Sequence, residues 1–442
     1  MDEGDDPKRM AMKRYRLAER RKAIGLSQEK LAEAMGVDRS TVARWERAAA
    51  DPQPWHRPKL AAALLISTEE LAELLANAHY GGNHYSPQDD LADLGLDRQD
   101  DDVDRRTFLP MTALPVLGGL PAIVDLLTPF NGQTTKPPTK PAVSLVQAER
   151  LTGQVKTLYQ ACHYRTALEL LPNLIAGLAE LAATSGPELK PRIAALTADA
   201  YHVVASIMLK LGDNTLATLA AQRALETANS SGDLVAVTCS ARIMTHVLMS
   251  IGHGDRAISL ASHAADTLRG STHEWNISGG LSAFGALMLR AAIAAARMND
   301  RSTALALAAE AQIAAARLGH DANDRWTGFG PTNVDLHKVN IALTLGDAGT
   351  AINLARKIDL KKITLSERKA CLFTDVAQAY LQWGKQSAAL TALEMAYRVA
   401  PEEIRNRPLG RRICDDLIAT TRGPVRDRTI RFAQTVGLHL EH

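Results

Sequence analysis

Residues 25–46 of the chain read GLSQEKLAEAMGVDRSTVARWE. Ser27 is a favoured residue at a helix N-terminus, and Gly36 permits a tight turn nine residues later. Helical spacing turns two apolar sets inward: Leu31, Ala32 and Met35 before the turn, and Val42 and Trp45 after it. The stretch therefore predicts a short helix, a turn, and a second helix that packs on the first.

The second helix leaves a polar face opposite its apolar side. This face consists of Arg39, Ser40, Thr41 and Arg44. Arg, Ser and Thr side chains on a helix that follows a three- or four-residue turn are suited to reading base edges in the major groove of DNA. These four residues are therefore predicted DNA contacts, although Arg44 could instead be a solvated surface charge.

The runs Leu-Ser-Gln-x-x-Leu-Ala-x-x-x-Gly-Val and Thr-Val-Ala-Arg-Trp-Glu resemble the lambda-repressor-like (XRE) helix-turn-helix family. The resemblance implies that Gln28 also contacts DNA, where the alternative is that it closes the N-terminus of its own helix. It further implies a buried ion pair between Arg21 and Glu46. The loop after Glu46 departs from the family pattern because it lacks a glycine.

Charge is distributed unevenly along the chain, although the net charge is only +2. Residues 8–60 contain 14 basic and 6 acidic residues, whereas residues 88–104 contain eight Asp and one Arg. The basic segment predicts double-stranded DNA as a partner, with Lys13 and Arg14 contacting phosphates without reading sequence. The acidic segment is a candidate competitor with DNA for the basic one.

Composition predicts three parts: a helix-turn-helix domain over 10–76, an acidic and Pro-rich linker over 77–141, and a helical domain over 142–442. The linker contains an apolar connector, 107–130, preceded by two arginines. This segment resembles a twin-arginine export signal and, weakly, a membrane span. Its prolines and its distance from the N-terminus favour packing on the C-terminal domain without stable membrane insertion. A membrane-tethered protein is the weaker alternative.

From residue 142 onward, a short turn followed by a helix-start alanine recurs six times. The alanines are Ala167, Ala217, Ala257, Ala304, Ala351 and Ala388. Four of them have Gly or Asn five residues earlier, which predicts a left-handed helix end, and three have a capping Asp four residues earlier (Asp213, Asp300 and Asp347). These hairpins resemble tetratricopeptide repeats, which stack into a solenoid with a concave groove. The predicted fold is all-α: a helix-turn-helix domain and a C-terminal α-solenoid of tetratricopeptide-like hairpins.

This combination of domains resembles actinobacterial regulators and, more distantly, peptide-pheromone-sensing regulators, and the segment GFGPTNV at 328–334 is similar to the actinobacterial group. The resemblance implies a peptide in the groove, held by Asn side chains. The predicted ligand-binding residues are Asn333, His337, Asn340, Asn276, Arg242, His246 and His202. A solvated helix face is the alternative for each. Neither the His nor the four Cys residues have metal-ligand spacing, so no metal is expected.

These features predict a cytoplasmic DNA-binding transcriptional regulator that binds a near-palindromic operator as a homodimer. Its repeat domain would sense a peptide or small ligand, mediate dimerisation, or both. Nucleotide-binding, metalloprotease and hydrolase motifs are missing from the sequence, so neither an enzyme nor a cofactor is expected. The alternative is a scaffold whose repeat domain binds another protein while DNA binding only anchors the complex.

Overall fold

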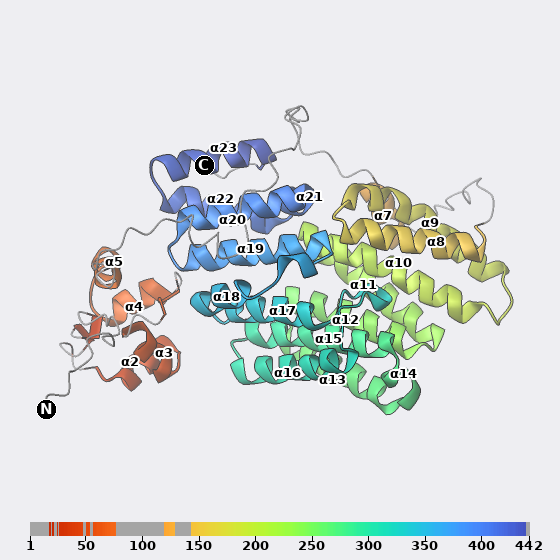
Figure 1. Ribbon diagram of the computed structural model, residues 1–442, viewed down its shortest axis with the longest axis horizontal. Helices are drawn as coiled ribbons and strands as arrows, with labels where there is room; N and C mark the ends of the chain where they lie inside the picture. Colours follow the sequence, from red (N-terminus) through yellow and green to blue (C-terminus); the bar gives the residue numbers. More distant parts are fainter. Residues whose placement is uncertain are drawn as a thin grey trace, which may run out of the picture.

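The computed structural model describes residues 17, 18, 20, 21, 24, 26–46, 50–53, 56–76, 119–128 and 143–438. These residues form helices and turns without a strand, so the predicted all-α fold is confirmed (Figure 1). Lys13, Arg14, the acidic segment and most of the linker lie outside the described residues. The domain boundaries at 10, 76 and 141 remain predictions.

The described helices of the N-terminal domain are α2 (Gln28–Met35), α3 (Arg39–Glu46), α4 (Arg57–Ala63) and α5 (Thr68–Ala76). The Ser27 hydroxyl accepts a 3.1 Å hydrogen bond from the Lys30 amide, and Gly36 ends α2 at φ 71°. Both features match the prediction. Val42 and Trp45 of α3 are buried with the apolar side of α2, so α3 is fixed with its other face outward.

A short helix, α7 (Leu120–Leu127), precedes the repeat domain. The helices of that domain are α8 (Leu145–Gln160), α9 (Tyr164–Thr184), α10 (Lys190–Leu211), α11 (Asn214–Ser231), α12 (Leu234–Ser250), α13 (Gly254–Gly270), α14 (Thr272–Asn276), α15 (Ser278–Arg297), α16 (Arg301–Leu318), η3 (Asp324–Trp326), α17 (Pro331–Thr344), α18 (Ala348–Ala355), η4 (Leu360–Lys362), α19 (Ser366–Gln382), α20 (Gln386–Val399), α21 (Pro401–Asn406), α22 (Pro408–Thr420) and α23 (Pro424–Val436). Ile123 and Leu127 bury α7 in the core of the first hairpins.

The six helix-start alanines are all buried, each at the third or fourth residue of the second helix of a hairpin. Four or five residues before each alanine lies a residue with positive φ: Cys162, Gly212, Gly252, Asn299, Gly346 and Gly384. Cys162 and Gly384 thus have the conformation that was predicted only for the other four. The left-handed residue ends one helix, and the small alanine lets the next helix pack closely.

The repeats coil far enough for the first hairpins to contact the last ones (Figure 1). At this junction the buried Lys210 ammonium of α10 lies 2.7 Å from carboxylate oxygens of both Glu367 in α19 and Glu403 in α21. The Tyr164 hydroxyl donates a further 2.5 Å hydrogen bond to Glu403. Burial opposes the charge on Lys210, but the Glu367 and Glu403 carboxylates raise its pKa well above the usual value.

Three helices are long and apolar enough to cross a membrane by length and composition alone: Tyr164–Thr184, Lys190–Leu211 and Ser278–Arg297. Each contributes side chains to the cores between hairpins. In Ser278–Arg297, 89% of the apolar window is buried within the protein, so packing between hairpins already accounts for its composition.

Replacing Lys210 with Met is expected to lower the free energy of unfolding by about 3–5 kcal/mol, because two buried carboxylates lose their shared cation. Urea unfolding followed by circular dichroism measures this change. The control is Lys190→Met, at the exposed start of the same helix, with an expected change within about 0.5 kcal/mol. Equal changes in the two variants would contradict a closing role for Lys210.

Candidate nucleic-acid interface and repeat-domain cavity

The outward face of α3 carries the four residues predicted from its polar pattern. Arg39 and Ser40 are exposed, whereas Thr41 and Arg44 are half-buried. The Arg39 guanidinium lies 2.6 Å from the Glu29 carboxylate, but both side chains remain at least 60% exposed. Such a pair exchanges readily with solvent or with another anion. Arg39, Ser40 and Thr41 therefore present hydrogen-bonding groups of the kind that base edges accept.

Gln28 of α2 takes part in a buried ion pair between Arg21 and Glu46 of α3. Arg21 Nε lies 2.5 Å from Glu46 Oε1, and both side chains are 7% exposed. The Gln28 amide donates a 2.7 Å hydrogen bond to Glu46 Oε2. The buried Arg21–Glu46 pair is thus present as the resemblance implied. The Gln28 amide binds Glu46 rather than the end of its own helix.

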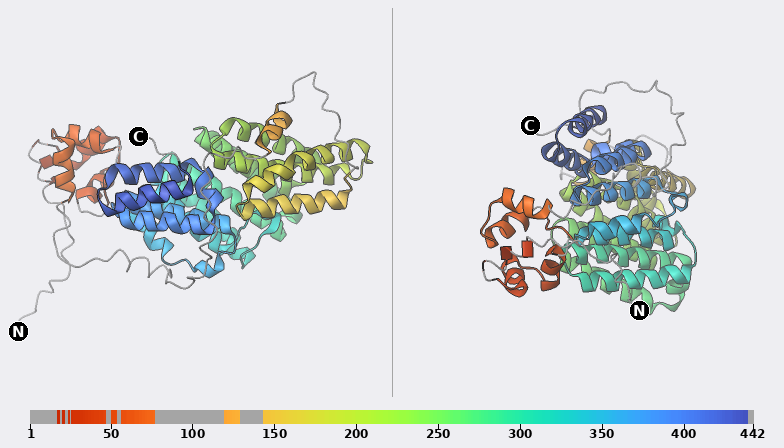
Figure 2. Two further views of the ribbon diagram at one scale, coloured as in Figure 1. Left: turned by 90° about the horizontal axis from the view of Figure 1, so that it is seen from above. Right: turned by 60° about the vertical axis from the view of Figure 1, so that its left-hand side comes forward.

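Arg44 makes a contact that the sequence did not indicate. Its guanidinium lies 2.5 Å from Oδ1 of Asp347, in the turn between α17 and α18 of the repeat domain. Arg301 binds the other oxygen of Asp347 at 2.6 Å, and the Gln53 amide donates to the Gly346 carbonyl at 3.4 Å. The N-terminal domain consequently lies against the repeat domain (Figure 2), with α3 on the side that faces it (Figure 1).

A cavity of about 410 Å³ lies between α3 and this turn, lined by Ser40, Thr41 and Arg44 on one side and Arg297, Arg301 and Asp347 on the other.

The prediction that Asp347 caps α18 is wrong, because its side chain makes no capping hydrogen bond. The equivalent Asp213 and Asp300 do cap their helices. Asp347 differs because its carboxylate is occupied by two arginines.

Helix α17 is fixed at its start by the segment that includes GFGPTNV. The Phe329 ring is fully buried against Gly285 of α15, where an added Cβ would lie 1.9 Å from the ring. The Asp321 carboxylate accepts hydrogen bonds from the Thr332 amide at 2.9 Å and from its hydroxyl at 2.6 Å. Asp321 thereby caps the helix that Pro331 begins, which sets the rotation of α17.

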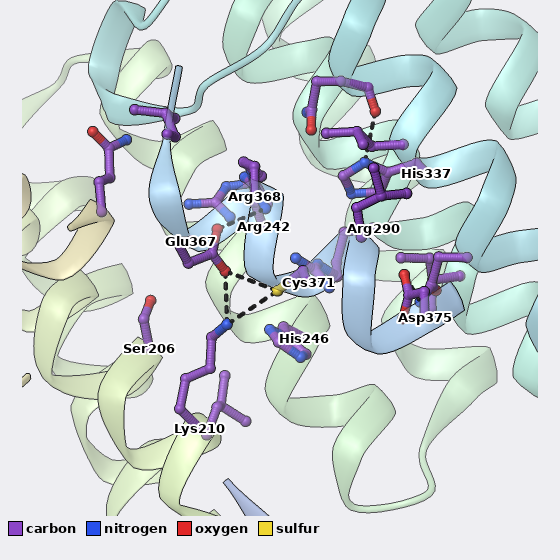
Figure 3. Close-up of a pocket in the computed structure, with 18 of the residues that line it drawn as sticks. Ser206, Lys210, Arg242, His246, Arg290, His337, Glu367, Arg368, Cys371 and Asp375 are labelled. Carbon is purple, nitrogen blue, oxygen red and sulfur yellow. Dashed lines mark hydrogen bonds and ion pairs between the residues drawn. The ribbon is translucent and has the colours of Figure 1, made fainter. Parts of the chain in front are cut away.

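This rotation turns the polar side of α17 into a cavity of about 160 Å³ on the inside of the repeat coil (Figure 3). Five of the seven predicted ligand residues line it: Asn333, His337, Asn340, Arg242 and His246. The other two do not. His202 contacts Asp199 at 3.3 Å and the Ser240 hydroxyl at 2.7 Å, and Asn276 bonds to Thr272 and Arg317.

The cavity is also lined by charged residues that were not among the predicted ligand residues: Lys210, Arg290, Arg297, Glu367, Arg368 and Arg407. A sequence signal did exist for two of them. Lys210 stands in the apolar run VVASIMLKL, and Arg290 in the run ALMLRAAIAAA. A single cation within a long apolar run of a helix indicates a buried position, and a buried cation requires a partner or a ligand.

Both cavity histidines are held neutral. Burial, together with Arg368 and Arg290, lowers the pKa of His337 to about 3, and burial with neighbouring arginines lowers the pKa of His246 well below its usual value. His337 Nδ1 lies 2.9 Å from the Asn333 carbonyl oxygen, so the neutral ring donates there. The two histidines therefore add hydrogen-bonding capacity without adding charge.

Glu367, Cys371 and Glu403 each place a potential metal-ligand atom within 4.8 Å of the others. The Lys210 ammonium already lies 2.7 Å from both carboxylates. Burial and Glu367 raise the pKa of Cys371 to about 12, so the thiol is protonated at neutral pH. The carboxylates of this cluster are thus already paired with a cation of the protein itself.

Residues 17–71 match the family model described as "Helix-turn-helix". The sequence has no match among curated proteins. Among solved structures, the chain is similar to PlcR of Bacillus thuringiensis, whose structure is a complex with the peptide PapR7 and DNA. The two share 13% identity with a TM-score of 0.35, over 86% of this chain and 99% of that chain. From the match to residues 17–71, the chain contains a helix-turn-helix DNA-binding domain of the XRE family.

Proposed function

We propose that this chain is a cytoplasmic transcriptional regulator whose helix α3 reads double-stranded DNA and whose repeat-domain cavity binds an effector, a peptide or a small molecule. The observation that carries the proposal is the outward face of α3. Arg39, Ser40 and Thr41 project from a helix that Val42 and Trp45 hold in place, within the segment that matches the helix-turn-helix family. Two such helices in a homodimer would read a near-palindromic operator.

The contact between Arg44 and Asp347 supports a means of regulation. In this arrangement Arg44 binds the repeat domain, and Ser40 and Thr41 line the cavity beside it. The repeat domain lies against the Arg44 side of this face, whereas Arg39 and Ser40 remain exposed, so a DNA duplex that contacts all four residues would have to displace it. DNA binding would require the N-terminal domain to leave Asp347, so an effector that changes the position of this turn would change the affinity for DNA.

Helix α17 connects the effector cavity to this contact. Asn333 and His337 line the cavity from the first half of the helix, and the helix ends at Thr344, two residues before Gly346 and three before Asp347. Arg297, at the end of α15, lines both cavities. A rigid helix transmits a displacement along its axis, so a ligand in the effector cavity that moves α17 would also move the turn that contacts Arg44.

The double substitution Arg39→Ala, Thr41→Ala is expected to abolish discrete DNA sites, since each base contact contributes about 1–3 kcal/mol of discrimination. Genome-wide mapping of DNA bound by the intact protein measures this, with sites sharing an inverted repeat expected for the unmodified chain. Arg223→Ala, an exposed arginine of the repeat domain, is the control and should retain the sites. Diffuse binding by the unmodified chain would favour the scaffold alternative.

Asp347→Asn is expected to tighten operator binding by about 5-fold or more, because it weakens the contact that holds α3 away from DNA. Fluorescence anisotropy with a mapped operator measures the affinity. Asp335→Asn removes the same charge from an exposed position of α17 and serves as the control. An equal gain in both variants would mean that net charge alone is responsible.

A further inference from the structure

The repeat-domain cavity contains more positive charge than its own acidic groups neutralise. Lys210 is paired with Glu367 and Glu403, and Arg407 lies 3.0 Å from Glu403. Arg368 lies 3.4 Å from Glu367 and donates to the Thr327 carbonyl. These acidic groups are therefore shared among three cations.

Arg242 of α12 and Arg290 of α15 have no acidic partner among the described residues. The Nε atoms of both are buried without a hydrogen bond. Burial, with Arg242 and Arg368 nearby, lowers the pKa of Arg290 to about 9, which still leaves it charged at neutral pH. In Figure 3 the side chains of Arg242, Arg290 and Arg368 enter the same space.

The side-chain amide of Asn333 lines the same cavity as these two arginines and is also without a hydrogen-bond partner. Its side chain is 4% exposed and lines the cavity, yet neither its nitrogen nor its oxygen has a hydrogen-bond partner. Leaving a buried donor or acceptor unpaired costs about 1–3 kcal/mol for each group, and leaving a buried charge unpaired costs more. An arrangement of two unpaired arginines and one unpaired amide is stabilised by a ligand that supplies what each lacks.

We infer that the cavity binds a ligand carrying an oxyanion, a carboxylate or a phosphate, which pairs with Arg242 and Arg290 while a neighbouring amide or hydroxyl pairs with Asn333. This inference rests on the proposed function of the cavity as an effector site. A volume of about 160 Å³ admits a small molecule or the end of a peptide and excludes a folded protein. The free C-terminus of a peptide, a carboxylate next to an amide, has the required chemistry.

Thermal unfolding of the full chain tests this with three probes at constant ionic strength: inorganic phosphate, N-acetylglycinate and its neutral amide. Anion binding should raise the unfolding temperature above that in chloride, and the neutral amide should have no effect. A larger effect of phosphate would identify a phosphate ligand, and a larger effect of N-acetylglycinate a carboxylate ligand.

Arg242→Gln and Arg290→Gln are expected to bind the effective anion about 10-fold to 100-fold more weakly, since each loses a charge-assisted hydrogen bond. Arg256→Gln, an exposed arginine of α13 outside the cavity, should bind it as the unmodified chain does. Without anion, both cavity variants should unfold at or above the temperature of the unmodified chain, because an unpaired buried charge has been removed. If either fails to fold, the comparison of anion with neutral amide in the unmodified chain decides.

Equal stabilisation by the anion and its neutral amide, or undiminished binding by the cavity variants, would overturn the inference. The result is separable from the proposed function. If the chain binds the anion but has no discrete DNA sites, the inference about the cavity's ligand stands and the proposed regulatory function is contradicted. If the chain has discrete DNA sites but does not bind the anion, the proposed regulatory function stands and the inference of an oxyanion ligand is contradicted.

Discussion

The shape of the repeat domain depends on one buried ammonium group. Lys210, near the end of α10, lies between a carboxylate of α19 and one of α21, so the second hairpin is joined to elements more than 150 residues later in the chain. Stacked hairpins normally contact only their neighbours and leave the inside of the coil open. The pairing of Lys210 with Glu367 and Glu403 adds a contact across the coil. The inner faces of α10, α12, α15, α17 and α19 then surround a common space.

Enclosure changes the electrostatics of that space. Arginine side chains on an open concave surface would be solvated and would interact weakly. Enclosed, both Arg242 and Arg290 are desolvated, which lowers the pKa of each, and the Arg368 charge lowers both further. The Arg242 charge also lowers the pKa of Arg290. The same enclosure holds the two histidines neutral. The closing ion pairs and the unpaired arginines therefore belong to one arrangement. The ion pairs of Lys210 close the coil, and the closed coil gives Arg242 and Arg290 their low-dielectric surroundings.

Local chemistry was sufficient to predict the elements. Ser27, Gly36 and the Val42–Trp45 pair determine the two helices of the N-terminal domain through interactions within 20 residues, and the six alanines mark hairpins by the same local rules. Local pattern also brought five of seven expected ligand residues to the cavity. It misplaced His202, whose ring turns toward Asp199 and Ser240. It could not place Arg44, because the partner of this residue is 303 positions away. Asp347 was misjudged for the same reason, since a capping position says nothing about what packs against it.

The ion pair of Arg44 with Asp347 has a consequence for measurements on the cavity itself. Under the proposed function, a ligand that favours release of α3 binds more tightly when α3 is already released. Linkage requires that a ligand which multiplies the affinity for DNA by some factor has its own affinity multiplied by the same factor when DNA is bound. The operator then acts as an effector of the cavity, because the protein bound to its operator has a different affinity for the ligand from the free protein. The threshold concentration at which the cell responds becomes a property of the protein and the operator together.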